Sequence, residues 1–483
     1  MKARWSWYAG DVVRIKYGLA SRGFVNRLLC KPKFVGRGLA GGLLALFTAL
    51  LSVGATPATA QTAGDALSWG AGGSGQLGVG SLQNSALPLR PLLPTGAAVT
   101  AIAAGAQHGV AVTTRGVFAW GGNDSGQLGN GDNLRNSAPV NVVIPPGTFI
   151  TAVAAGDEHT LALTSTGQVL AWGSNRLGQL GNPSIGPTSN VPVRVALPPG
   201  VTVVGVAAGD FHSLAVTSTG GVLAWGSNEF GQLGNGTDRN ESRTPVPVSL
   251  PPGTAVTSVT AGGMHSVART VTGGVLTWGL NDAGQLGDGT NDERDAPVPV
   301  TLPAGTVVTE VASGVLASHT LALTSAGQVL AWGSNQSGQL GRGNQIGSNV
   351  PVPTALPAST VATAIAAAGV NSVAVTASGQ VLSWGDNSLG QAGDGAAGGI
   401  NALPVQASLP ANTSATDVAA GNGFNLVVSQ STNSQGPDTG DGATAAGGPR
   451  HGLIVGGVLA LALAWWAGAA IRRGNRRRLA PTS

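Results

Sequence analysis

Five histidines recur at nearly constant spacing and could bind a metal ion. They are His108, His159, His212, His265 and His319. Imidazole is a common ligand of zinc, but zinc needs bonds of about 2 Å. Equivalent positions in separate repeats of a wide ring lie too far apart to share one ion. We place Asn371 and Asn425 at the same position in the last two repeats. Because His and Asn both form hydrogen bonds, we interpret this position as a strut between repeats.

Two other patterns resemble ligand sites, but their context argues against them. Residues 70–75, GAGGSG, fit the dinucleotide fingerprint G-x-G-x-x-G, which requires a following helix, whereas a further hairpin is expected here. Residues 288–292, DGTND, resemble the start of a calcium loop, but Glu293 and Pro299 replace the glycine and glutamate that an EF-hand requires. Weak surface calcium binding is left open. We nominate no catalytic group, metal or cofactor.

A tryptophan followed by glycine marks each of seven repeats. The successive tryptophans are separated by 51, 52, 53, 53, 54 and 52 residues. A period of this length indicates one supersecondary unit used repeatedly. We interpret these residues as core wedges between sheets, because each supplies a large apolar area at a fixed place. They are Trp69, Trp120, Trp172, Trp225, Trp278, Trp332 and Trp384.

Each repeat is predicted to contain four short strands, named A to D. Residues 201–209, VTVVGVAAG, and 212–217, HSLAVT, give strands A and B; a turn, STGG, leads to strand C at 222–226 and then to strand D at 245–250. Short β-rich runs bounded by Gly, Pro, Ser and Asn indicate strands with tight turns. Seven such units predict an all-β, seven-bladed β-propeller.

The ends of the repeat region predict how the ring closes. The first repeat begins with strand C at residues 66–70, and the last repeat, residues 416–429, contains only strands A and B. The two halves complement each other, so one split blade is expected to combine both ends of the chain and leave no open sheet edge. An open solenoid would need polar capping repeats, which the sequence lacks.

The repeats resemble those of the regulator of chromosome condensation (RCC) family. The resemblance rests on AAG-x-x-H-[ST], the T-x-x-G turn, the AWG strand and GQLG-[ND]-G, and covers residues 65–429. It implies a seven-bladed propeller, but propellers carry unrelated functions. Some exported bacterial relatives inhibit β-lactamases through one propeller face. The Gly-Trp-Arg-His-Thr motif of a light-sensing relative is absent.

Residues 1–60 are predicted to be a leader and residues 61–430 the propeller. A basic segment precedes the apolar residues 39–53, and Ala58-Thr59-Ala60 fits a signal-peptide cleavage site. The alternative is an uncleaved amino-terminal anchor. The sole cysteine, Cys30, lies in the leader, so we expect no disulfide or thiol chemistry in the exported part.

The carboxyl-terminal segment is predicted to tether the ring at the cell surface. Residues 431–452 read as a flexible linker, and residues 453–471 are uncharged and long enough to span a membrane as a helix. Arginines in residues 472–483 would hold that end in the cytoplasm. Residues 436–440, GPDTG, resemble the sorting signal LPxTG except at Gly436, so cell-wall anchoring remains an alternative.

The charge balance of the ring argues against nucleic acid as a partner. Residues 61–430 carry 10 arginines, no lysine and 18 acidic residues, for a net charge of about −8. The A–B and C–D turns are expected to share one rim, which carries 15 of these acids against six arginines. That field should favour a cationic partner or one bridged by divalent ions.

The same rim is predicted to be the binding face, because its turns vary among repeats while those of the other rim, TSTG and LPPGT, are nearly constant. The nominated binding residues are Leu177, Phe211, Phe230, Met264, Asp157, Glu158, Asp210 and Glu229. The first hypothesis is a monomeric, non-catalytic protein-binding module displayed at the surface. The alternatives are an enzyme acting on envelope polysaccharide and, by resemblance, a guanine nucleotide exchange factor. Export and acidity conflict with the last of these.

Overall fold

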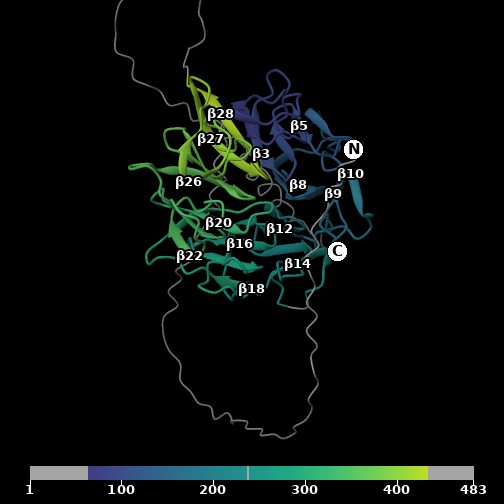
Figure 1. Cartoon of the computed structure of the whole chain (residues 1–483). Helices are drawn as coiled ribbons and strands as arrows, with labels where there is room; N and C mark the ends of the chain where they lie inside the picture. Colours follow the sequence, from purple (N-terminus) through teal and green to yellow (C-terminus); the bar gives the residue numbers. More distant parts are fainter. Residues whose placement is uncertain (1–63, 237–238, 433–483) are drawn as a thin grey trace, which may run out of the picture. The chain divides into compact units, whose positions relative to one another are not determined.

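Seven four-stranded antiparallel sheets form a closed β-propeller in the computed structural model (Figure 1). The structure describes residues 64–236 and 239–432. The strands within each blade run from A inside to D outside, and the inner strands of all seven blades line a central channel. The all-β, seven-bladed prediction is therefore confirmed.

Blade 1 combines the two ends of the ring. Its strands, from the inside outward, are β27 (Thr413–Gly421), β28 (Phe424–Ser431), β1 (Asp65–Gly70) and β2 (Ser85–Leu89). Blade 2 contains β3 (Val99–Ala104), β4 (His108–Thr113), β5 (Gly116–Gly121) and β6 (Asn136–Asn141). Blade 3 contains β7 (Ile150–Ala155), β8 (His159–Thr164), β9 (Val169–Ser174) and β10 (Thr188–Arg194).

The remaining blades follow in chain order. Blade 4 contains β11 (Val203–Ala208), β12 (His212–Thr217), β13 (Val222–Gly226) and β14 (Ser242–Pro247). Blade 5 contains β15 (Val256–Ala261), β16 (His265–Thr270), β17 (Val275–Gly279) and β18 (Arg294–Pro299). Blade 6 contains β19 (Val308–Ala312), β20 (His319–Thr324), β21 (Val329–Gly333) and β22 (Ser348–Pro353). Blade 7 contains β23 (Ala362–Ala368), β24 (Asn371–Thr376), β25 (Val381–Asp386) and β26 (Ile400–Gln406).

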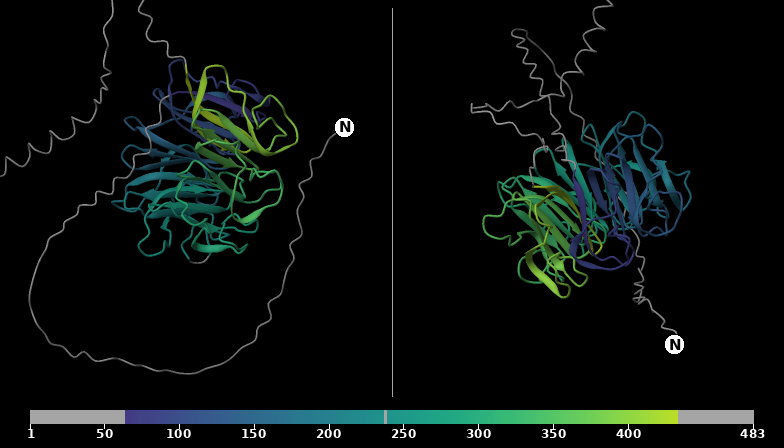
Figure 2. Two further views of the ribbon diagram at one scale, coloured as in Figure 1. Left: turned by 90° about the vertical axis from the view of Figure 1, so that its left-hand side faces the viewer. Right: turned by 90° about the horizontal axis from the view of Figure 1, so that it is seen from above.

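The ring closes by pairing β1 with β28, as the split blade predicted. Their register runs from Asp65 opposite Ser429 to Gly70 opposite Phe424. Both views in Figure 2 show the first strands, in purple, beside the last strands, in yellow-green. Gly64 exchanges two backbone hydrogen bonds with Val99. In blades 3 to 7 the glycine of the B–C turn accepts the corresponding bond, so the chain entry takes the place of the turn that blade 1 lacks.

The seven tryptophans are buried between blades and hydrogen-bonded, which confirms them as wedges. Each is at most 1% exposed, and each indole Nε1 donates to a glutamine carbonyl of the preceding blade at 2.8–2.9 Å. The accepting carbonyls belong to Gln391, Gln76, Gln127, Gln179, Gln232, Gln285 and Gln339. A buried N–H without an acceptor is costly, so this bond fixes how each blade packs on the next.

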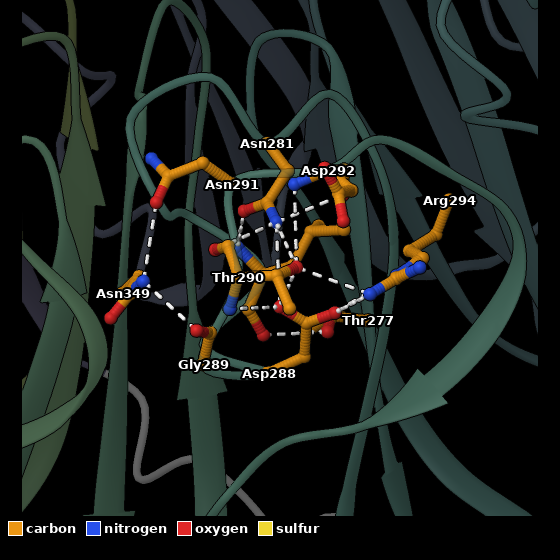
Figure 3. A network of polar contacts seen from close by, with 10 residues as sticks. Thr277, Asn281, Asp288, Gly289, Thr290, Asn291, Asp292, Arg294 and Asn349 are labelled. Atoms are coloured by element: carbon orange, nitrogen blue, oxygen red, sulfur yellow. Dashed lines mark hydrogen bonds and ion pairs between the residues drawn. The ribbon is translucent and has the colours of Figure 1, made fainter.

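In blades 2 to 7 a buried asparagine organises the C–D loop, as blade 5 shows (Figure 3). The Nδ2 group of Asn281 donates to the carbonyls of Thr290 and Asp292 at 3.1 and 2.9 Å. The Asp288 carboxylate accepts bonds from Thr290 and Arg294. Burial acts to raise the pKa of Asp288, but these hydrogen bonds outweigh it and lower the pKa. The loop that resembled a calcium site thus supplies its own donors to this carboxylate.

The flanking predictions concern residues that the structure does not describe. The leader (1–60), most of the linker (431–452), the proposed membrane helix (453–471) and the basic tail (472–483) lie outside the described residues. Within residues 64–236 and 239–432, no helix is long and apolar enough to cross a membrane.

Candidate functional site

The eight nominated residues lie on one rim, in blades 3 to 5. Asp157 and Glu158 connect β7 to β8, Asp210 and Phe211 connect β11 to β12, and Met264 connects β15 to β16. Leu177 follows β9, and Glu229 and Phe230 follow β13. A–B and C–D connections leave the same end of an antiparallel blade. The fold therefore brings together side chains from turns that are up to about 100 residues apart.

The nominated residues differ in exposure. The four apolar side chains, Leu177, Phe211, Phe230 and Met264, are half-buried, as are Asp157 and Glu158, and Glu229 is exposed. Asp210 is only 4% exposed. The prediction of Asp210 as a surface contact residue is therefore corrected, because its carboxylate is used inside the rim.

Neighbouring blades place equivalent C–D and A–B residues next to each other along this rim, and the character of these residues changes around the ring. A C–D residue of one blade lies beside an A–B residue of the next. Ser74 donates to Gln107 at 2.9 Å, and Ser125 donates to Glu158 at 2.8 Å. The equivalent positions at the next two interfaces hold the apolar pairs Leu177 with Phe211 and Phe230 with Met264. The rim thus passes from self-satisfied polar pairs to apolar pairs with no hydrogen bonds to exchange.

The acidic side chains of blades 3 and 4 form a locally negative region beside the apolar pairs. Burial raises the pKa of Asp157 to about 6, and the nearby Glu158 adds to the rise. Burial likewise raises the pKa of Asp210 to about 7; a hydrogen bond from the Leu316 amide opposes this rise and Asp157 adds to it. Both groups thus carry partial charge near neutral pH.

The charge of the outer loops is lower than a count of acids suggests. Arg239 pairs with Glu293 and Asp295, and Arg294 pairs with Asp288. The exposed pairs of Arg239 contribute little to stability, but all three pairs cancel local charge. Among the described residues, the unpaired negative charge on blades 3 and 4 therefore concentrates near the mouth of the channel.

The histidines form hydrogen-bonded struts, as predicted. Each Nε2 lies 2.9–3.0 Å from a hydroxyl of the next blade. The pairs are His108–Thr160, His159–Ser213, His212–Ser266, His265–Thr320 and His319–Ser372. Each hydroxyl donates its own proton to a glutamine carbonyl, so Nε2 must carry the imidazole proton. Among the described residues, no group of three or more His, Cys, Asp or Glu is placed to hold a metal ion.

One assignment at this position was wrong. Phe424, not Asn425, faces Gly421 as His108 faces Gly105. Asn425 instead takes the place of the hydroxyl and accepts a 3.2 Å hydrogen bond from Asn371. The contact of blade 1 with blade 2 is therefore apolar where the others are polar, because Phe424 replaces the histidine of the strut.

A partly buried pair of acidic residues, which was not among the predicted site residues, lies on the inner strands. Glu310 and Asp417 occupy equivalent positions of strand A in blades 6 and 1, where the other blades have Ala, Gly or Ser. Burial, followed by the charge of Asp417, raises the pKa of Glu310 to about 8, against the opposing effects of the Ile365 amide and Arg269. A comparison of the repeats position by position could have found two acids among small residues.

The arrangement of repeats, wedges and struts identifies the family. The sequence profile of the RCC1-like domain matches residues 65–427. The chain belongs to the RCC1-like domain family. This RCC1-like chain is 33% identical over 351 residues to the ultraviolet-B receptor UVR8 of Arabidopsis thaliana, covering 72% of this chain and 78% of UVR8.

Other RCC1-like proteins differ in what surrounds the propeller. The chain is 33% identical over 279 residues to the human E3 ubiquitin-protein ligase HERC2, which is 57% of this chain but only 6% of HERC2. Among solved structures it is similar to Prp20p from Saccharomyces cerevisiae, with a TM-score of 0.67, 26% identity and coverage of 77% of this chain and 93% of Prp20p. That protein has been described with its binding properties to Gsp1p and histones.

Proposed function

We propose that the protein is a non-catalytic protein-binding module and that the A–B and C–D rim of blades 3 to 5 is its binding face. The observation that carries this proposal is the change from hydrogen-bonded to apolar interblade pairs on that rim. Half-buried aromatic and thioether side chains in a fixed frame are suited to act as anchors, and protein–protein interfaces are enriched in Phe and Met. The binding properties of the related Prp20p support this class of function.

The opposite rim is less suited to specific recognition. Its B–C turns repeat nearly the same residues, and their hydroxyls are used internally. In blade 4 the Thr217 hydroxyl lies 2.9 Å from that of Thr219 and accepts the Gly221 amide at 3.0 Å. Blades 5 and 7 repeat this arrangement. This rim has nearly the same residues in each blade, and its hydroxyl groups are hydrogen-bonded within the turns. It therefore offers few distinctive groups for a partner to recognise.

Photo-cross-linking tests the choice of face. A photoreactive residue replaces Phe230 on the proposed face or Thr219 on the other rim, in the otherwise unchanged full chain. After irradiation in an extract of the source cells, we expect a discrete cross-linked protein with the first variant and none with the second. The same adduct from both positions, or adducts only from position 219, would contradict the proposal.

A second candidate, a polysaccharide-cleaving enzyme, is favoured by one observation. Burial, followed by the nearby Asp417, raises the pKa of Glu310 to about 8, and a carboxyl group that keeps its proton near neutral pH can serve as the general acid of a glycosidase. Depolymerisation of an envelope glycan by the native protein, abolished in Glu310→Gln, would establish this activity. Depolymerisation that Glu310→Gln leaves intact, or none at all, would remove Glu310 from consideration.

We also propose that the ring is displayed outside the cell and tethered by residues 453–471. This rests on the basic and apolar pattern of the leader, the apolar run and the arginines that follow it. Protease added to intact cells should release a fragment of nearly the whole ring. A fully protected protein would contradict this orientation. Replacing Thr439 should leave the protein extractable by detergent if a cell-wall sorting reaction normally removes it from the membrane.

A further inference from the structure

The connection between strands A and B of blade 6 differs from its six counterparts. It spans residues 313–318, whereas blades 2 to 5 use three residues at this point. Because strand A lines the channel, a longer A–B connection can fold inward over the mouth of the channel. We name residues 313–318 the central loop.

The central loop packs against blades on several sides of the mouth. Val315 is 1% exposed and belongs to one apolar cluster with Ala106 of blade 2, Ala368 of blade 7 and Ala420 of blade 1. Its carbonyl accepts the Gly369 amide at 2.8 Å. The loop therefore places a buried apolar side chain between residues of blades 1, 2 and 7 and is held by backbone hydrogen bonds.

Leu316 points the other way, and its position is fixed by residues two blades away. Its amide donates to the Asp210 carboxylate of blade 4 at 2.7 Å. On blade 5, a side chain at Gly263 would come within 3.0 Å of Asp210 and 3.4 Å of the Leu316 Cα, so the three residues are tightly packed. The Leu316 side chain nevertheless remains 44% exposed.

The backbone of Leu316 is also in an unfavourable conformation. Its φ angle is +58°, which costs a branched residue about 1–2 kcal/mol and is usually left to glycine. Residues kept in such conformations cluster at ligand-contacting sites. Here the cost maintains an exposed leucine at the centre of the proposed face, between the turns that carry Phe211 and Met264.

We propose that Leu316 is the central anchor of the binding face and that it docks a protein segment carrying an apolar side chain beside lysine or arginine. The inference rests on the function proposed above and adds the contact residue and the chemistry of the partner. Leu316 and its neighbouring apolar pairs take the apolar side chain.

The charge of the turns around Leu316 indicates which charge the partner segment carries. The carboxyl groups of Asp157, Glu158 and Asp210 lie on the adjoining turns, and the five ion pairs among the described residues include none of them. An acidic segment, a nucleic acid or the same face of a second copy would meet like charge. A basic segment would be attracted, and salt would weaken that attraction.

Selection from a random twelve-residue peptide library displayed on phage, against the immobilised full-length protein, tests the inference. We expect enriched peptides to place a large apolar residue next to Lys or Arg. Synthetic versions should bind Leu316→Ala at least tenfold more weakly than the unchanged protein. The matched control is Leu134→Ala, which removes a leucine that is 73% exposed at the periphery of the same rim and should change binding less than twofold.

A second variant separates charge from position. Asp210→Asn keeps an oxygen that can accept the Leu316 amide but removes the negative charge. The affinity of the Asp210→Asn variant for the peptides should therefore depend less on salt concentration. Leu316→Ala should still weaken peptide binding when it is combined with Asp210→Asn. Unaltered salt dependence would contradict the proposed electrostatic contribution.

The outcomes distinguish this inference from the function on which it rests. If the peptides are weakened by Phe230→Ala but not by Leu316→Ala, Leu316 is not the anchor and the proposed face stands. If the enriched peptides are acidic, the chemistry assigned to the partner is wrong. If no peptide is enriched, or if the peptides bind the opposite rim, both the inference and the proposed function are contradicted.

Discussion

At the scale of single residues, each repeated side chain has one hydrogen-bonding task between blades. The histidine donates to a hydroxyl of the next blade, and that hydroxyl and a tryptophan indole both donate to one glutamine carbonyl, as His108, Thr160, Trp172 and Gln127 show. Gly105 of the AAG motif is required because a Cβ there would lie 2.3 Å from the His108 ring. The motif thus records the contact between blades rather than a catalytic site.

The histidines predict how stability depends on acid. Burial lowers the pKa of His108 and His319 to about 4 and, with neighbouring histidines adding, that of His159, His212 and His265 to about 3. The unfolded chain takes up these protons near pH 6.5, whereas the folded ring does not, so stability falls as pH decreases from 6.5 towards 4. Each histidine contributes up to about 1.4 kcal/mol per pH unit in that window.

The raised carboxyl pKa values act in the opposite direction. Asp157, Asp210 and Glu310 keep a proton in the folded ring at pH values where the unfolded chain has lost it, so their contribution is fully present below about pH 4 and is lost progressively as pH rises from there to the folded pKa values of about 6, 7 and 8. The histidine struts are tested by denaturant titrations between pH 4.5 and 6.5. Over this range the unfolding free energy of His212→Asn should change less steeply with pH than that of the unchanged protein, by the equivalent of about one proton. An unchanged pH dependence would contradict the assignment of His212 as a side chain that stays neutral in the folded ring.

At the scale of elements, the sequence predicted the features that recur from repeat to repeat. The strands, the tryptophan wedges and the shared rim follow from periodic residues, and Asn371 already showed that an amide can replace the histidine. The contact between Asp210 and Leu316 could not be predicted, because it joins turns 106 residues apart in a loop with no counterpart in other repeats. Burial of Asp210 depends on that same contact.

The buried asparagine of the C–D loop provides a test at this scale. Asn281 is fully buried, and Asn281→Ala would leave backbone groups of the loop in Figure 3 without partners. We expect a loss of about 2–4 kcal/mol of unfolding free energy. The exposed neighbour Asn291 donates one bond to the Asp282 carbonyl and accepts one from Asn349; because water can replace both bonds at the surface, Asn291→Ala should cost less than about 1 kcal/mol. Equal costs in denaturant titration would show that the loop is not organised by Asn281.

At the scale of the molecule, closure joins the two ends of the ring in one blade. Because β1 pairs with β28 over six residues, blade 1 and the closed ring are not complete until the last strands are in place. Deleting residues 416–429 should therefore lower the melting temperature far more than deleting residues 435–483, since the first deletion exposes two sheet edges. Equal melting temperatures for the two deletions would be incompatible with this closure.

The face proposed for binding is tested most directly by the affinity of the cross-linked partner for paired rim variants. In isothermal titration calorimetry, Phe211→Ala and Phe230→Ala should each weaken binding by more than about 1 kcal/mol, as interface anchors do, and added salt should weaken it further. Thr219→Ala on the opposite rim should leave the dissociation constant unchanged. Equal effects from both rims, or an affinity indifferent to salt, would contradict the assignment of this face.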